Sequence, residues 1–304
     1  MKLPAMDAEA LATFLAVHRA GGFSRAAERL HRSQPAISRR IALLEAELGA
    51  PLFDRAAAGI SLSQAGRVLL PYAERALAAL EDARAAVRGL AGDDAGPVRM
   101  AVVGTLASTG LTRVLQAFAE DHPHVDLRLR TATSAEVSQL VRIGEADLGL
   151  RYHADTSGDL AYERIGREPL VVVCAGGHRL AGRRVADLAA LRSERWLAFP
   201  DVPVRREFAA AHIFALFLAR GLSDVAWTAV DSLTAQKRLA EAGFGLALVP
   251  ESSIAEELAA GSLATIGVGD LDAAQEVIAV TRRDGFLSAA AQRLLALVRE
   301  TAKA

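Results

Sequence analysis

The segment HRSQPAISRRIALLEAELG, residues 31–49, decides the fold of the N-terminal part of the chain. Ser33 is a suitable N-cap, and Pro35 fits the first turn of a helix, where its missing N–H is not needed. Four apolar residues then recur at helical spacing and predict one buried face: Ile37, Ile41, Leu44 and Leu48. The segment is therefore predicted to be a helix that packs on one side and exposes the other.

The exposed side of this helix is predicted to carry a positive patch. At about 100° per residue, Arg39 lies roughly 200° from Ile37, and Pro35 and Ser38 flank it. Residues 25–40 contain five arginines and one glutamate, although the whole chain has a net charge of −1. Arginines on a surface helix are usually just solvated, so the cluster alone does not define a binding site.

The segments before this helix give the cluster its context. A first helix is predicted from Asp7, an acceptable N-cap, to Gly21, which stops it. Ser24 is then predicted to cap a short second helix, in which Ala26 and Ala27 permit close packing. A short helix, a tight turn and a longer helix make a helix-turn-helix, whose second helix enters the major groove of DNA. In that context the arginine cluster favours contacts with phosphates and base edges.

A long alanine-rich stretch over residues 64–90 predicts a single helix, which Pro71 would bend early. Two apolar seams recur at seven-residue spacing, one with Leu69, Ala76, Ala83 and Leu90, the other with Ala73, Leu80 and Val87. This repeat is typical of a coiled coil and favours pairing with a second copy of the chain. Packing of the helix on its own domain is the alternative.

The region after the linker-like segment 91–97 alternates short β-like runs with amphipathic helices, which predicts a mainly parallel sheet covered on both faces. Ligands of such sheets bind beyond the C-terminal strand ends, where helix N-termini offer free N–H groups. This rule selects polar residues at four strand ends, namely Thr105 to Ser108, Thr133 with Ser134, Asp201, and Asp231 with Ser232.

These residues predict a small-molecule site. Hydroxyl groups and helix starts suit a small anion such as a carboxylate, whereas Asp231 favours a ligand that bears an amine. Each Ser or Thr serves equally well as a simple N-cap. Arg151, which follows another strand, is a candidate partner for an anionic ligand, with Asp155 or Asp159 as alternative partners.

Residues 23–66, FSRAAERLHRSQPAISRRIALLEAELGAPLFDRAAAGISLSQAG, closely resemble the N-terminal domain of LysR-type transcriptional regulators. The resemblance rests on the alanine pair, Ser33-Gln34-Pro35, Ser38, Leu44-Glu45, Leu48-Gly49, Leu52-Phe53, Arg55 and Ala65-Gly66. It implies a winged helix-turn-helix in which residues 53–63 form the wing and Arg55 reaches DNA, although Asp54 or Glu47 could instead pair with that arginine. It also implies that Gln34, Pro35, Ser38 and Arg39 face the major groove; Arg25 and Arg32 complete the predicted DNA-binding set.

The resemblance extends over nearly the whole chain and implies an α/β fold class with three parts. Residues 1–63 would form the DNA-binding domain, residues 64–96 a linker and dimerisation helix, and residues 97–304 a two-subdomain effector domain similar to periplasmic solute-binding proteins. Subdomain I would cover about 97–167 and 269–304, and subdomain II about 168–268. The implied partners are double-stranded DNA, a small-molecule effector, a second copy in a dimer or tetramer, and RNA polymerase; no cofactor is expected.

Other function classes find little support. Cys174 with His178 suggests a nucleophile, but a cysteine at the end of an apolar strand is usually core. The runs at 122–124 and 243–245 lack the context of a metal or phosphate site. No apolar run approaches the roughly 18 residues of a membrane span, and the single cysteine agrees with a cytoplasmic protein. The remaining alternative is a small-molecule-binding protein or enzyme whose N-terminal helices only mediate oligomerisation.

Overall fold

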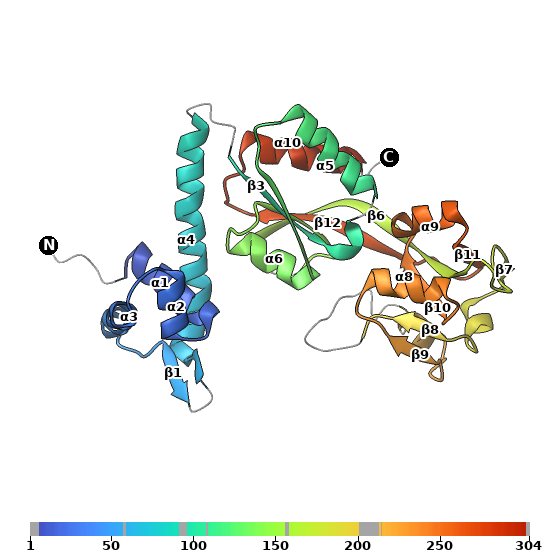
Figure 1. Cartoon of the computed structure of the whole chain (residues 1–304), viewed down its shortest axis with the longest axis horizontal. Coiled ribbons are helices and arrows are strands. Elements are labelled where there is room, and N and C mark those ends of the chain that lie inside the picture. Colours follow the sequence, from blue (N-terminus) through green and yellow to red (C-terminus); the bar gives the residue numbers. More distant parts are fainter. Residues whose placement is uncertain are drawn as a thin grey trace. The chain divides into compact units, whose positions relative to one another are not determined.

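The computed structural model of the chain describes residues 6–56, 59–90, 96–107, 109–155, 158–200, 213 and 215–301. They divide into two compact units, of which the first is built on the helices and hairpin before residue 93. The second is built mainly on the strands and helices that follow (Figure 1). This division corresponds to the change of sequence pattern from helical periodicity to alternating strands and helices.

The first unit contains α1 (Ala8–Ala20), α2 (Phe23–Arg29), α3 (Gln34–Leu48), β1 (Phe53–Ala56), β2 (Gly59–Leu62) and α4 (Gln64–Leu90). Asp7 caps α1, because its carboxylate accepts a hydrogen bond from the N–H of Ala10 at 2.7 Å, and Gly21 ends the helix with a left-handed φ of 64°. The prediction that Ser24 caps α2 is wrong. The N-cap is Gly22, and the buried ring of Phe23 occupies the first helical position.

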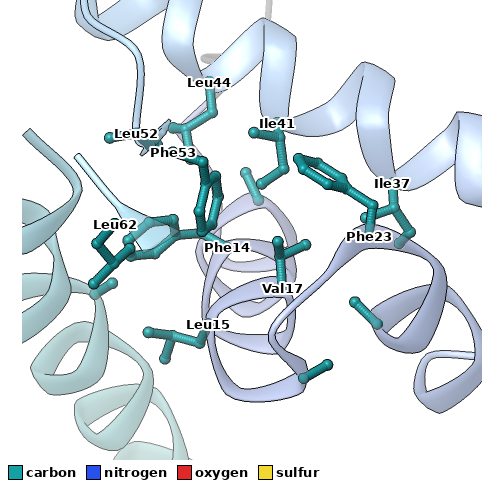
Figure 2. Packing of buried hydrophobic residues seen from close by; sticks show 14 of the residues in the cluster. Phe14, Leu15, Val17, Phe23, Ile37, Ile41, Leu44, Leu52, Phe53 and Leu62 are labelled. Atoms are coloured by element: carbon teal, nitrogen blue, oxygen red, sulfur yellow. The ribbon is translucent and has the colours of Figure 1, made fainter. Parts of the chain in front are cut away.

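The core of the first unit gathers the apolar stripe of α3 against α1 and the hairpin, as Figure 2 shows. Ile37, Ile41 and Leu44 are buried, as predicted. The ring of Phe53 lies between those of Phe14 and Phe23, with centroid distances of 5.4 and 5.8 Å. The prediction for the fourth residue of the stripe is wrong, because Leu48 is the last residue of α3, extends past the core and is 39% exposed.

Two contacts join α3, the hairpin and α4. The N–H of Leu52 donates to Oε1 of Glu45 at 2.7 Å and fixes the turn that leaves α3. Gly66, in the first turn of α4, lies so close to this turn that a Cβ there would be 2.1 Å from the carbonyl oxygen of Leu52. The hairpin itself is antiparallel, with Phe53 opposite Leu62. The close approach of α4 to the turn after α3 therefore requires a glycine at position 66.

Helix α4 begins as part of this domain. Ala73 is fully buried, and Leu69 and Leu77 pack against the helix-turn-helix core, so the first turns of α4 pack on their own domain. Farther along, Leu80 is 42% and Val87 is 68% exposed. The predicted coiled-coil seam is thus divided between intradomain packing and exposed apolar side chains.

The second unit is an α/β structure built on one long, composite sheet. Its elements are β3 (Val98–Val103), α5 (Thr109–Asp121), β4 (Leu127–Ala132), α6 (Ser134–Arg142), β5 (Leu148–Tyr152), β6 (Leu160–Ala175), β7 (Arg184–Val185), β8 (Trp196–Ala198), β9 (Trp227–Ala229), α8 (Leu233–Glu241), β10 (Leu246–Pro250), α9 (Ala255–Ala260), β11 (Leu263–Val268), β12 (Ala274–Arg282) and α10 (Ala289–Thr301), with short 3-10 turns at Gly104–Leu106, Leu188–Leu191 and Glu251–Ile254.

Strands run in the order β4-β3-β5-β12-β6-β10-β8-β9. β3 is parallel to β4 and β5, and β8 is parallel to β9 and β10. The long strands β6 and β12 cross antiparallel between these two parallel sets. Helices α5 and α10 pack side by side on one face of the first set, and α6 covers the other face (Figure 1). The predicted two-subdomain α/β architecture is confirmed.

Replacing Gly66 by Ala is expected to destabilise the first unit by about 1–3 kcal/mol or more, because the new Cβ would overlap the backbone of Leu52. The measurement is thermal or denaturant unfolding of the full chain. Gly96→Ala is the matched control, since nothing lies within 4 Å of a Cβ there. Equal stability of the two variants would contradict the close contact.

Candidate DNA-binding surface and effector cavity

The N-terminal turns of α3 present polar groups that the domain does not use. Gln34, Pro35 and Arg39 are exposed, and Ser38 is half-buried. Within the part of the chain that the structure describes, the side chains of Gln34, Ser38 and Arg39 make no hydrogen bond or ion pair. These groups are therefore free to contact an external partner.

The other predicted arginines differ from Arg39 in their surroundings. Arg25 donates from Nε to the carbonyl of Ala20 at 2.6 Å and from a terminal nitrogen to Gly21 at 2.7 Å, so its guanidinium caps the end of α1. Arg32 is 64% exposed and lies 3.7 Å from a carboxylate oxygen of Glu9. Such an exposed pair is weak and does not withdraw Arg32 from DNA.

Arg40, next to Arg39 in sequence, is half-buried and forms ion pairs with two carboxylates of its own domain. It lies 3.0 Å from Glu9, in the first turn of α1, and 3.4 Å from Asp7, the N-cap of that helix. Two adjacent arginines therefore have different environments, one paired and one open. The sequence contained no sign of this, because the pairing joins residues 33 positions apart.

The wing contributes to the same face. A shallow hollow is lined by residues of α2, α3 and β2, namely Phe23, Ser24, Arg25, Gln34, Ser38 and Ile60, with the two glycines after α1. Arg55 pairs with Ile60 in the β1–β2 ladder. The side chain of Arg55 lies outside the described residues, so its contact with DNA stays a prediction.

A cavity of about 550 Å³ opens in the second unit at the C-terminal ends of β3, β4, β8 and β9. Its lining includes four predicted residues, Thr105, Thr133, Asp231 and Ser232, which are far apart in the sequence. This is the place that the topology of open α/β sheets favours for ligands. The remaining polar lining comes from residues that the sequence did not single out: Thr131, Glu136, Thr234, Lys237, Ser252, Ser253, Glu256 and Glu257.

Four predicted effector residues are not among this lining. Ser108 and Asp201 lie outside the described residues. Ser134 begins α6 but does not line the cavity. Arg151 is 8% exposed and lies 2.9 Å from Asp155, an alternative partner that the sequence left open. It also donates to the hydroxyl of Ser138, so its charge is held within the fold.

Lys237 and Glu257 form a largely buried ion pair in the cavity wall. Nζ of Lys237 lies 2.7 Å from Oε1 of Glu257 and donates to the carbonyl of Ser253 at 2.8 Å. The two side chains are 18% and 9% exposed. The sequence did offer one sign that Lys237 is unusual, because it is the only lysine between residues 3 and 302.

One wall of the cavity is bonded to the crossing strand β6. The N–H of Ser252, which lines the cavity, donates to Oε1 of Glu168 on β6 at 3.2 Å. Burial raises the pKa of the Glu168 carboxyl above its usual 4.5, hydrogen bonding with Ser252 offsets part of this rise, and the nearby charge of Glu251 adds a smaller rise. The folded protein therefore favours the protonated form of Glu168 more than the unfolded chain does.

The cysteine considered as a nucleophile is a core residue. Cys174 is fully buried, its thiol donates to the carbonyl of Ala264 at 3.5 Å, and burial raises its pKa to about 11. His178 instead accepts from the N–H of Leu180 at Nδ1. Over the described residues, no group of three potential metal ligands occurs and no helix is long and apolar enough to cross a membrane.

A winged helix-turn-helix with an open polar helix start, combined with an α/β unit that has a cavity at its strand ends, defines a DNA-binding protein with a ligand-binding domain. Residues 8–67 match the family model of the bacterial regulatory helix-turn-helix proteins of the lysR family, and residues 91–303 match the LysR substrate binding domain. The chain belongs to the LysR family of DNA-binding transcriptional regulators.

Known relatives agree with this assignment. The chain is 30% identical over 281 residues to the RuBisCO operon transcriptional regulator of Allochromatium vinosum, covering 92% of this chain and 91% of that protein. It is similar to the crystal structure of CbnR, a LysR family transcriptional regulator, with a TM-score of 0.67, 26% identity and coverage of 98% and 100%. CbnR complexed with its target DNA gives a TM-score of 0.65 at 26% identity, covering 97% and 100%.

The family assignment decides between the two functions considered from the sequence. The relatives are transcriptional regulators, so the N-terminal helices belong to a DNA-binding domain. The alternative, in which these helices only mediate oligomerisation of a binding protein or enzyme, is set aside.

The variant Glu168→Gln is expected to be more stable than the wild type at neutral pH. The raised pKa means that the folded state binds an extra proton, so wild-type stability falls as the pH rises above about 4.5 through the folded pKa of Glu168. Glutamine lacks this dependence, and its advantage should disappear as the pH falls below 4.5. Urea unfolding at several pH values measures the stability of the variant and of the wild type, with Glu300→Gln as an exposed control. A stability difference between Glu168→Gln and the wild type that does not change with pH would refute the prediction.

Proposed function

We propose that the chain recognises operator DNA through the start of α3. Arg39 would contact a guanine edge or phosphate, Gln34 and Ser38 would read neighbouring bases, and Pro35 would pack at the groove. Arg32 and Arg55 would hold the DNA backbone, while Arg25 supports the surface by capping α1. The observation that carries this proposal is that Arg39 has an open guanidinium beside the internally paired Arg40.

We propose that residues 97–304 sense a small-molecule effector, which binds in the cavity lined by Thr105, Thr133, Asp231 and Ser232. Binding would favour closure of the two parallel sets of strands about β6 and β12, a ligand-biased shift between two arrangements. Residues 64–96 would carry this change to residues 1–63. The chain would use no cofactor and catalyse no reaction, and it would act in the cytoplasm, where bacterial DNA lies.

Pairing through α4 completes the proposal. One helix-turn-helix reads few base pairs, whereas two linked copies read a two-fold symmetric site with much higher affinity. The exposed side chains of Leu80 and Val87 support such pairing. A dimer, further assembled into a tetramer, would then present two DNA-binding units at one promoter and contact RNA polymerase.

If Arg39 reads a base edge, Arg39→Ala is expected to weaken binding to a selected operator by about 1–3 kcal/mol, and to weaken it unequally across variant sequences. Fluorescence anisotropy at several salt concentrations measures this on a fragment enriched from random DNA by the protein itself. Arg40→Ala is the matched control, and its effect on DNA affinity should be small, since Arg40 pairs with Asp7 and Glu9.

Three other outcomes would each contradict a different part of the proposal. A uniform loss on all sequences, with a salt slope reduced by about one, would show a phosphate contact only. Equal effects of Arg39→Ala and Arg40→Ala would refute the assignment of this surface. Absence of any salt-dependent DNA binding by the wild type would refute the proposed function itself.

The double variant Leu80→Glu with Val87→Glu is expected to shift the chain towards monomer, because it places charges in an apolar helix–helix seam. Sedimentation velocity measures the assembly, and affinity for a two-fold site should fall far more than affinity for a half-site. Glu81→Gln, on the polar side of α4, is the control. An unchanged assembly in the double variant would exclude this seam.

A further inference from the structure

We propose that the effector is a cation, with an amine or guanidinium group bound by the carboxylates of the cavity. This inference rests on the proposed function, in which the cavity is the effector site. The sequence alone left open whether the ligand is a carboxylate or bears an amine.

The described lining of the cavity is strongly acidic. It contains four carboxylates, of Glu136, Asp231, Glu256 and Glu257, and a single basic group, Lys237. The apolar part of the lining comes from Phe199, Pro200, Leu233 and three alanines, and threonine and serine hydroxyls supply most of the remaining polar groups. A negatively charged ligand would therefore enter a field of its own sign.

The single basic group is already engaged. Lys237 lies 2.7 Å from Oε1 of Glu257 and donates to the carbonyl of Ser253, so its charge is compensated inside the wall. Glu257 is buried, and its second oxygen, Oε2, has no hydrogen-bond partner among the described residues. A buried carboxylate oxygen without a partner is costly, and a donor from a cationic ligand would satisfy it.

Helix N-termini usually favour anions, but acidic residues of the chain itself lie at or next to the two helix starts beside this cavity. At α6, the N–H of Thr133 donates to Oε2 of Glu136 at 2.9 Å, and the N–H of Glu136 donates to the hydroxyl of Thr133 at 3.3 Å. This reciprocal capping box places the chain's own carboxylate at the helix N-terminus. At α8, the hydroxyl of Ser232 accepts from the N–H of Ala235, and Asp231 is the residue before this N-cap. The start of α6 thus already holds a carboxylate of the chain, and an acidic residue precedes the start of α8.

The cavity volume and lining suit a small, flexible amine with hydrogen-bonding capacity. Three probes with the same four-carbon chain separate the effect of charge from that of size: 1,4-diaminobutane, 4-aminobutanoate and butanedioate. They carry two, one and no ammonium groups, respectively. Each is added to the purified full chain at matched ionic strength, because exposed charges are screened by salt.

Thermal unfolding of the full chain measures binding, since a ligand that binds only the folded state raises the unfolding midpoint. At about 10 mM, 1,4-diaminobutane is expected to raise the midpoint by roughly 2–5 °C. The rise should be smaller for 4-aminobutanoate and absent for butanedioate. In Asp231→Asn and Glu256→Gln, both exposed positions that tolerate substitution, the rise with the diamine should fall by about half or more.

Asp224→Asn is the matched control, because it removes an exposed carboxylate outside the cavity and should keep the full rise. The inference is overturned if butanedioate raises the midpoint as much as the diamine, if the diamine has no effect, or if its effect survives in both cavity variants. DNA affinity measured on the same preparations tests the proposed function separately. If the thermal experiment overturns the inference but the protein still binds its operator, or if that binding changes with butanedioate through the cavity, the proposed function as a regulator stands. Only the inferred ligand class is then wrong.

Discussion

The burial of the α3 stripe against α1 and the hairpin is the constraint on which the DNA-binding unit depends. Ile37, Ile41 and Leu44 enter the core only if the residues half a turn away face outward, and Arg39 is among them. The close approach of Gly66 to Leu52 then fixes how α4 leaves the same core. One packing arrangement thus exposes the start of α3, which we propose as the DNA-contacting surface, and sets the direction of α4, which we propose as the dimerisation helix.

The elements of this unit were predictable because their signals are local. Helical periodicity, the cap at Asp7 and the stop at Gly21 each depend on a few neighbouring residues. The errors arose where a contact with another element decides the outcome. Phe23 fills a place in the core and therefore begins α2 ahead of Ser24, and Leu48 extends past the core because α3 ends there.

Charges were harder to interpret than apolar residues. The sequence shows five arginines between residues 25 and 40, but it does not show which of them the fold engages. Arg25 caps α1 and Arg40 pairs with the first turn of α1, so the open cation at the start of α3 is a product of tertiary structure. The same holds in the second unit. The strand-end rule correctly predicted that Thr105 and Asp231 line the cavity. It did not predict the ion pair between Lys237 on α8 and Glu257 on α9, because that pair depends on how the two helices pack.

The acidic lining would give the proposed effector cavity a physical means of responding to its ligand. Thr133 and Glu136 lie at the start of α6, beside the first parallel set of strands, whereas Asp231 and Glu256 lie at or near α8 and α9, beside the second set. The strands β6 and β12 connect the two sets. Under the proposed closure, carboxylates on opposite walls would repel each other and disfavour the closed arrangement without a ligand. A ligand shifts the equilibrium only by the difference in its affinity for the open and closed arrangements. In the proposed mechanism a cation held by both walls would offset the repulsion most in the closed arrangement, so the charge that selects the ligand would also supply the free energy of the switch.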